Sequence, residues 1–133
     1  MHEQEALSAV VGRYLDALYD GDIAAFREVL HPEARLFSAT EGILVALDRE
    51  QYLEIVAGRP SPAARRDPRH DEILSVTLGS PTTAHARVKN AYLPKCFTDE
   101  LTLVRLDGAW RVVAKVWHFD IAAATEPAAP APV

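Results

Sequence analysis

The sequence has only one cysteine, Cys96, and so cannot form an intramolecular disulfide. Structural disulfides belong to oxidising compartments, and a lone cysteine favours a reducing one. The first residues, Met1 to Glu5, are acidic where a secretory signal carries positive charge. No apolar run approaches the ~20 residues that a membrane-spanning helix needs. These absences predict a cytoplasmic protein with no membrane partner.

The sequence also lacks an excess of basic residues, a metal-ligand pattern and a glycine-rich phosphate loop. Its formal net charge of −5 argues against a general nucleic-acid or anionic-membrane binder. The five histidines show no paired spacing of the kind that holds a metal on one helix. Cys96 stands beside a turn, with no helix N-terminus to activate its thiol. We therefore predict no metal, no cofactor and no nucleophilic cysteine.

Helical patterns fill the first part of the chain. Apolar residues recur at helical spacing from Glu5 to Tyr19, and Asp20-Gly21 ends that helix. Asp22 is placed to cap a short second helix that stops at His31-Pro32. The spacing of Asp48 and Gln51 predicts a capping box and a third helix through Ala57.

Strand patterns dominate the second part, where the apolar period changes from helical to two. Two short strands are expected at 34–39 and 43–47, before the third helix. A basic, proline-rich loop at 58–70 leads to four antiparallel strands at 73–78, 83–93, 97–106 and 109–119. Length and composition fit one α+β domain over residues 1–121, a strongly bent antiparallel sheet packed on N-terminal helices, with an Ala/Pro-rich flexible tail at 122–133.

The dipeptide Asp107-Gly108 predicts a two-residue hairpin turn, which places Leu106 opposite Ala109. Carried along both strands without interruption, this register puts Asp99, Val116 and His118 on one largely apolar face. Lys115 then lies on the opposite, mixed face.

A second expected register joins Asn90 to this group. If Leu93 faces Cys96, Asn90 lies opposite Asp99. Asn90, Asp99 and His118 then form a polar trio on an apolar surface, and polar groups there must be satisfied by one another, by water or by a ligand. The trio is therefore either a satisfied structural cluster or part of a binding site.

The chain resembles the nuclear transport factor 2-like superfamily, which includes ketosteroid isomerases and SnoaL-like polyketide cyclases, and most closely its lumazine-binding branch. The likeness spans about residues 5–120. Its motifs are Arg13-Tyr14-Leu15, Tyr19-Asp20-Gly21-Asp22, the stretch from Leu30 to Phe37, the stretch from Phe97 to Val104, Asp107 to Val112, and Lys115-Val116-Trp117-His118. The resemblance implies a cystatin-like cone with a pocket at its open end, and frequent homodimers. One scaffold of this kind hosts many functions.

Ketosteroid isomerase gives a test of mechanism through this resemblance. Its oxyanion-donor tyrosine matches Tyr14, and its oxyanion-hole aspartic acid matches Asp99. The position of its general base falls on Ser38, and a serine hydroxyl cannot replace a carboxylate as proton acceptor. The resemblance therefore argues against steroid-type isomerisation. It leaves His118 as the candidate base, with Tyr14 and Asp99 as orienting groups.

The sequence leaves three functions open: a small-molecule-binding domain, a proton-transfer lyase, isomerase or cyclase acting on a cyclic or polyketide-like substrate, and a dimeric interaction module. The missing base favours the first. A homodimer is expected through the mixed sheet face with Val104, Val113 and Trp117. Arginines of the 58–70 loop are either solvated charge or an anion clamp over the pocket mouth. The predicted ligand-binding residues are Tyr14, Phe37, Ser38, Tyr52, Asn90, Tyr92, Asp99, Val116 and His118.

Overall fold

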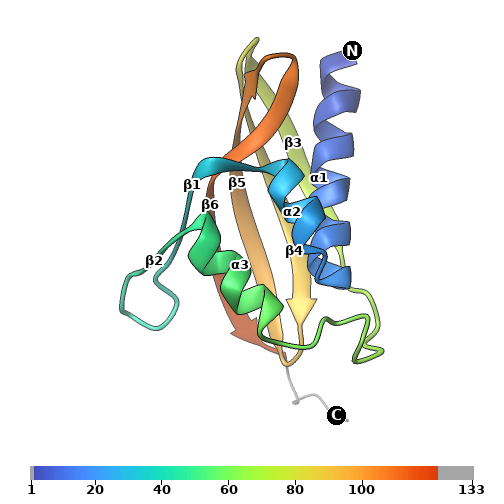
Figure 1. Cartoon of the computed structure of the whole chain (residues 1–133), viewed down its shortest axis with the longest axis vertical. Helices are drawn as coiled ribbons and strands as arrows, with labels where there is room; N and C mark the ends of the chain where they lie inside the picture. Colours follow the sequence, from blue (N-terminus) through green and yellow to red (C-terminus); the bar gives the residue numbers. More distant parts are fainter. Residues whose placement is uncertain (1, 123–133) are drawn as a thin grey trace.

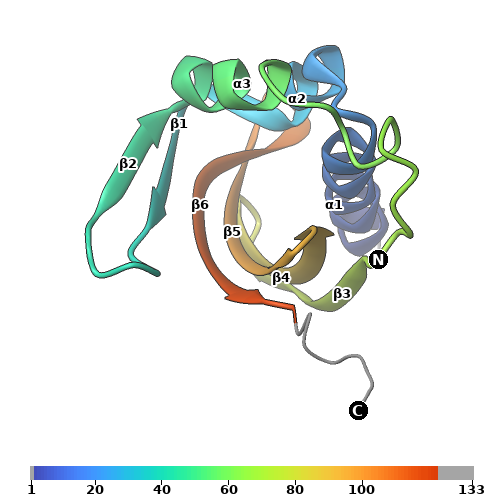
Figure 2. The same cartoon turned by 90° about the horizontal axis from the view of Figure 1, so that it is seen from below.

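A computed structural model of the chain describes residues 2–122. Three helices, α1 (His2–Asp20), α2 (Ile23–Val29) and α3 (Arg49–Ala57), lie against a single curved sheet of six strands. The sheet bends around α1, and α2 and α3 close one end of the curve (Figures 1 and 2). This arrangement confirms the expected α+β cone. The tail predicted beyond residue 121 falls almost wholly outside the described residues.

The helix ends follow the capping signals in the sequence. The Asp22 side chain accepts a hydrogen bond from the Ala25 amide at 3.1 Å, and so caps α2. At α3, Asp48 accepts from the Gln51 amide at 2.8 Å while the Gln51 side chain accepts from the Asp48 amide at 2.9 Å. The predicted capping box is confirmed. Gly21, with φ of +64°, ends α1 as a left-handed residue.

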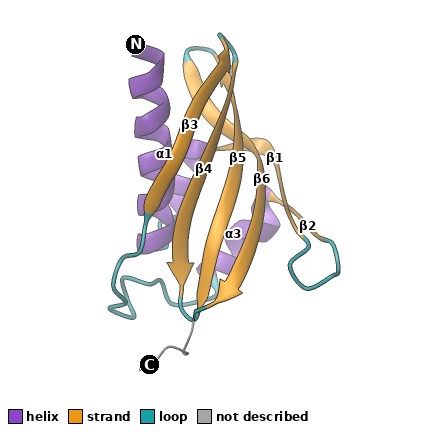
Figure 3. Ribbon diagram, turned by 180° about the vertical axis from the view of Figure 1, so that it is seen from behind, coloured by secondary structure: helices purple, strands orange, loops and turns teal. Residues whose placement is uncertain are grey.

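The strands are β1 (Leu30–Ser38), β2 (Val45–Asp48), β3 (Glu72–Ser80), β4 (Thr83–Tyr92), β5 (Lys95–Leu106) and β6 (Ala109–Ile121). Their spatial order is β2-β1-β6-β5-β4-β3, and β1 runs parallel to β6 while every other pair is antiparallel. Figure 3 shows the four long strands side by side, with α1 behind them. β1 begins earlier than predicted, because the chain is already extended at Leu30 and passes through Pro32 in strand conformation.

The β5–β6 hairpin has the predicted turn but not the predicted register along its whole length. Asp107 and Gly108 both have positive φ, and Leu106 pairs with Ala109. Beyond the pair Leu103–Val112, a β-bulge inserts Val113 as an extra residue, so Thr102 pairs with Ala114. A one-residue insertion turns every following side chain to the other face.

The bulge corrects the expected faces of β6. Lys115, which the uninterrupted register placed opposite Glu100 on the outer face, instead pairs with Leu101 and points inward. Trp117, expected in the outer dimer face, also points inward, while Val116 and His118 point outward.

The β4–β5 register also differs from the expectation, by two residues. Ala91 rather than Leu93 lies opposite Cys96, and Asn90 pairs with Phe97. A shift of two keeps every side chain on its expected face, because side chains alternate with period two. Asn90 therefore remains beside Asp99 as a diagonal neighbour.

The core lies between the concave sheet face and the helices. Leu7, Val11 and Tyr14 of α1 and Leu101 and Leu103 of β5 are fully buried members of this core. The outer sheet face carries an exposed ion cluster in which Glu100 contacts His85 and Arg87. Among the described residues, no helix is long and apolar enough to cross a membrane.

Candidate ligand-binding site

A cavity of about 440 Å³ opens at one end of the cone. It lies between the ends of β4, β5 and β6, the β1–β2 connection, the C-terminal end of α1, and α3. Its volume falls within the range of small-molecule sites. The lining is largely apolar and aromatic, and consists of Leu18, Ser38, Thr40, Glu41, Ile43, Val45, Leu47, Tyr52, Ile55, Arg59, Pro62, Asn90, Ala91, Tyr92, Lys95, Phe97, Lys115, Trp117 and Phe119.

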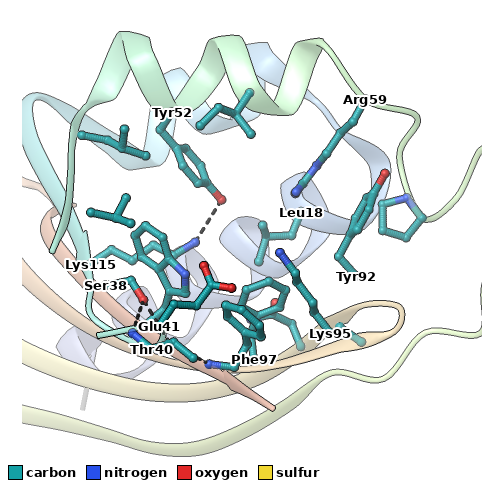
Figure 4. Close-up of a pocket in the computed structure, with 18 of the residues that line it drawn as sticks. Leu18, Ser38, Thr40, Glu41, Tyr52, Arg59, Tyr92, Lys95, Phe97 and Lys115 are labelled. Carbon is teal, nitrogen blue, oxygen red and sulfur yellow. Dashed lines mark hydrogen bonds between the residues drawn. The ribbon is translucent and has the colours of Figure 1, made fainter. Parts of the chain in front are cut away.

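Lys115 and Tyr52 form the polar floor of this cavity. The Lys115 side chain is 6% exposed, and its Nζ donates a hydrogen bond to the Tyr52 hydroxyl at 2.9 Å (Figure 4). The ammonium also lies 4.5 Å from the Tyr52 ring centre and 5.4 Å from that of Trp117. Burial lowers the pKa of Lys115, but the nearby Asp99 and Tyr52 together raise it by more than burial lowers it. The pKa of Lys115 therefore lies above its ordinary value. The floor is therefore cationic at neutral pH.

Behind the floor, Asp99 is fully buried and is the acceptor of a polar network. Its Oδ2 accepts hydrogen bonds from the Tyr14 hydroxyl at 2.6 Å and from Asn90 Nδ2 at 2.8 Å, and lies 3.8 Å from Lys115 Nζ. Its Oδ1 has no hydrogen-bond partner within residues 2–122. Burial first, and then the Asp99 charge, raise the pKa of Tyr14 well above its ordinary value. The Tyr14 hydroxyl thus stays protonated and donates.

Charged side chains also reach the cavity from its mouth. Arg59 follows α3, Lys95 begins β5, and Glu41 lies in the β1–β2 connection. Figure 4 shows the Arg59 and Lys95 nitrogens pointing toward the same part of the cavity, and the Glu41 carboxylate pointing into it. Unlike Lys115, these three side chains belong to residues with substantial solvent exposure.

Of the nine residues predicted to bind a ligand, Ser38, Tyr52, Asn90 and Tyr92 line the cavity. Tyr14 and Asp99 do not reach it, since both are fully buried in the network behind the floor. Tyr14 and Asp99, which the resemblance placed in one site, contact each other in this network, although their functional role stays a proposal.

Three predicted positions were wrong. His118 lies outside, where it contacts Asp120 at 3.2 Å and Thr40 at 3.4 Å, because the bulge turns it away from Asp99. Val116 is 46% exposed for the same reason. Phe37 pairs with Val116 across β1 and β6 and does not line the cavity.

The sequence reasoning missed Lys115, Trp117 and Phe119 as cavity residues. A signal was present: Trp117 and Phe119 alternate with His118 and Asp120, a pattern that favours the aromatic pair as the buried face. The 58–70 loop, whose arginines were considered as an anion clamp, contains Arg59, Arg65, Arg66 and Arg69, and of these Arg59 lines the cavity.

Two other arginines of the loop form ion pairs away from the cavity. Arg65 contacts Asp67, and Arg69 contacts both Asp16 and Asp71.

Within residues 2–122, no group of three His, Cys, Asp or Glu side chains could hold a metal ion.

Comparison with known proteins places this chain in a family. The family model described as "Putative lumazine-binding" matches residues 2–118. The chain belongs to this family, within the nuclear transport factor 2-like superfamily. A protein of this superfamily from Silicibacter pomeroyi, of unknown function, is 26% identical with a TM-score of 0.79, covering 90% of this chain and 97% of that one.

Two further relatives differ in what they imply. A ketosteroid isomerase-like protein from Erwinia carotovora atroseptica is 15% identical, with a TM-score of 0.68 over 86% of this chain and 94% of that one, and so shows the shared fold alone. The protein Aldolase FrzH from Cladobotryum sp is 25% identical over 118 residues, which cover 87% of this chain and 90% of that protein.

Proposed function

We propose that the cavity binds a small, flat ring compound whose carbonyl oxygen is held by Lys115 and Tyr52. The observation that carries this proposal is a pair of hydrogen-bond donors at the bottom of an aromatic cavity. The Lys115 ammonium has three N–H donors and uses one on Tyr52. The Tyr52 hydroxyl accepts that bond, and no acceptor for its own proton is present among residues 2–122. Both groups can therefore donate to one ligand oxygen.

The cavity walls suit a flat ring. Phe97, Trp117 and Tyr92 present aromatic surface around the floor, and aromatic rings favour offset or edge contacts with planar ligands. The family description names lumazine, a bicyclic ring with two carbonyl oxygens, which matches this arrangement of donors and walls. Asn90 and Ser38 supply further polar contacts at the edge of the floor.

Titration of the protein with lumazine, followed by the ligand's fluorescence, tests this proposal. Tyr52→Phe removes one donor and keeps the ring, so we expect affinity to fall about 2- to 10-fold, as for one hydrogen bond. Leu18→Trp places a larger ring in the cavity, where it obstructs a flat ligand, and is expected to weaken binding strongly. His118→Gln, outside the cavity, is the matched control and should bind as the natural chain does. No binding to the natural chain, or binding indifferent to Leu18→Trp, would overturn the proposal.

A second candidate function is acid–base carbon–carbon bond chemistry, favoured by the relative named as an aldolase. Lys115 and Tyr52 would stabilise an enolate oxygen, and Glu41 would accept the proton from the carbon beside the carbonyl. The enolate carbon then bonds to the carbonyl carbon of a second group, and the new alkoxide takes the proton back from Glu41. The raised pKa of Lys115 keeps it as an ammonium, so it acts as a donor rather than as an imine-forming amine.

Deuterium exchange tests the first half of this reaction. In D2O, the protein should exchange the protons beside the carbonyl of cyclohexanone, read by NMR, and Glu41→Gln should abolish this exchange. The control His118→Gln should exchange normally. Equal exchange in both variants would remove Glu41 as the base.

We further propose that the chain forms a homodimer through the outer sheet face and resides in the cytoplasm. Val104 and Val113 belong to the face expected from the sequence, and the exposed Val116 now joins them in place of Trp117. The exposed free thiol of Cys96 fits a reducing compartment. Sedimentation at micromolar concentration should give a dimer, and Val116→Asp should shift it toward monomer. A natural chain that sediments as a monomer would contradict the dimer.

A further inference from the structure

Arg59 and Lys95 approach the cavity mouth from different segments, one from the end of α3 and one from the start of β5. Their nitrogen ends point toward the same part of the cavity, beside Leu18 and Tyr92 (Figure 4). Two cations that converge on one space repel each other, so their placement calls for a compensating negative charge.

No carboxylate of residues 2–122 lies within ion-pair distance of either cation. By contrast, arginines elsewhere in the fold do find such partners, for example Arg27 with Glu50 at 2.7 Å and Arg87 with Glu100 at 2.9 Å. The acidic side chain in the cavity lining is Glu41, and it makes no ion pair with Arg59 or Lys95. The cavity mouth is thus locally positive in a chain whose net charge is −5.

Aromatic rings hold both cations in place without using their hydrogen-bond donors. The Arg59 guanidinium lies 4.0 Å from the centre of the Tyr92 ring, and the Lys95 ammonium lies 4.5 Å from that of Phe119. The Tyr92 ring is itself fixed, because its hydroxyl donates to the Pro60 carbonyl at 2.8 Å. No acceptor among residues 2–122 takes the guanidinium N–H groups of Arg59, which are left for a ligand in the planar fork that matches a carboxylate or phosphate.

We infer that Arg59 and Lys95 form an anion subsite at the cavity mouth. The donors at the floor and the cations at the mouth together select a ligand with two functional groups. Such a ligand is a ring with a carbonyl oxygen at one end and an anionic group, carboxylate or phosphate, at the other. This inference rests on the proposed small-molecule function and specifies the class of molecule. Arg59 supplies a two-pronged contact, and Lys95 supplies a point charge.

Two dyes with one carbon skeleton test the subsite. The anionic dye 8-anilinonaphthalene-1-sulfonate and neutral N-phenyl-1-naphthylamine differ only in the sulfonate, and both fluoresce on entering an apolar cavity. We expect the anionic dye to bind the natural chain at least 10-fold more tightly. Arg59→Gln should weaken the anionic dye about 10-fold or more, as for a charged hydrogen bond, and leave the neutral dye within 2-fold. Arg59→Lys should restore part of the loss.

Matched controls separate this subsite from general charge. Arg66→Gln removes the same charge from an exposed loop position outside the cavity and should change neither dye. Lys95→Gln should weaken the anionic dye by a smaller, salt-dependent factor. Competition by phenylacetate and by phenyl phosphate then shows which anion the subsite prefers. Thermal melting of each variant excludes dye binding to an unfolded chain.

The outcomes distinguish the two proposals. If both dyes bind equally, and Arg59→Gln and Lys95→Gln alter neither, the anion subsite is wrong while the cavity stands as a binding site. If Leu18→Trp leaves both dyes bound as before, the dyes do not occupy the cavity and the proposed function itself fails. The subsite would also be overturned if Arg66→Gln lowered the affinity for the anionic dye as much as Arg59→Gln does.

Discussion

The cation at the floor of the cavity and the two cations at its mouth differ in burial and in the groups that hold them. Lys115 at the floor is nearly inaccessible to solvent and is held by Tyr52 and Asp99, whereas Arg59 and Lys95 at the mouth reach solvent and rest on aromatic rings. A buried charge is tolerable only when it is paired and hydrogen-bonded, whereas water screens an exposed charge, so that leaving it without a protein partner costs the fold little. The floor is therefore part of what stabilises the fold, and the mouth is free to select a ligand.

The largest expected effect comes from breaking the floor at Asp99. Asp99→Ala leaves the Lys115 charge uncompensated and removes the acceptor of Tyr14 and Asn90, so we expect a loss of about 3–5 kcal/mol in the free energy of unfolding. Urea denaturation measures it. The control Glu100→Ala removes a carboxylate from the next residue, which lies on the outer face, and should cost less than about 1 kcal/mol. Equal losses in the two variants would show that the buried Asp99 carboxylate contributes no more to stability than an exposed one.

A smaller effect is expected at Tyr14, together with a change in pH dependence. Tyr14→Phe removes one donor to buried Asp99 and should lower the free energy of unfolding by about 1–3 kcal/mol. The folded pKa of Tyr14 is raised, so the unfolded chain loses this proton first, near the ordinary value of 10.0. Stability should therefore fall as pH rises above about 10, and Tyr14→Phe should reduce that slope.

Lys115 adds to the same alkaline loss. Its folded pKa is also raised, so its contribution is complete below the ordinary value of 10.5 and is lost above it. Unfolding curves between pH 8 and about 11 in the natural chain and in Tyr14→Phe measure the two contributions. A slope identical in both would show that the Tyr14 hydroxyl does not resist ionisation in the folded state.

The smallest effect on stability is expected at the mouth. Arg59→Gln removes a half-exposed cation without an acidic partner among the described residues, so the free energy of unfolding should change by no more than about 0.5 kcal/mol. Urea denaturation in parallel with Arg66→Gln provides the check. A loss as large as that of Asp99→Ala would mean that the mouth, like the floor, is structural.

The two halves of β6 show how far sequence reasoning reaches. From Ala109 to Val112 the register follows from the Asp107-Gly108 turn, since local turn chemistry fixes it. Past Val113 the prediction inverts, because Val112, Val113 and Ala114 are all apolar and suit either face. The position of the bulge is decided by packing against the rest of the sheet. Its consequence left a local trace in the alternation of Trp117 and Phe119 with His118 and Asp120.

Family resemblance, and not spacing, placed Tyr14 and Asp99 in one site, although the two residues lie 85 positions apart. Helix caps such as Asp48 and Gln51 were readable because their partners lie three residues apart. The cavity floor was not readable, because Lys115 and Tyr52 meet only after α3 folds over the end of the sheet.

Thiol labelling tests most directly whether the bulge turns Lys115 into the cavity and His118 away from it. In a Cys96→Ser background, Lys115→Cys and His118→Cys are compared by their rates of reaction with a thiol reagent under native conditions. Lys115 is 6% exposed and His118 is 60% exposed in their side chains, so we expect His118→Cys to react at least about 10-fold faster. Faster labelling of Lys115→Cys would support the uninterrupted register, with Lys115 on the outer face, and would contradict a cavity floor built on Lys115.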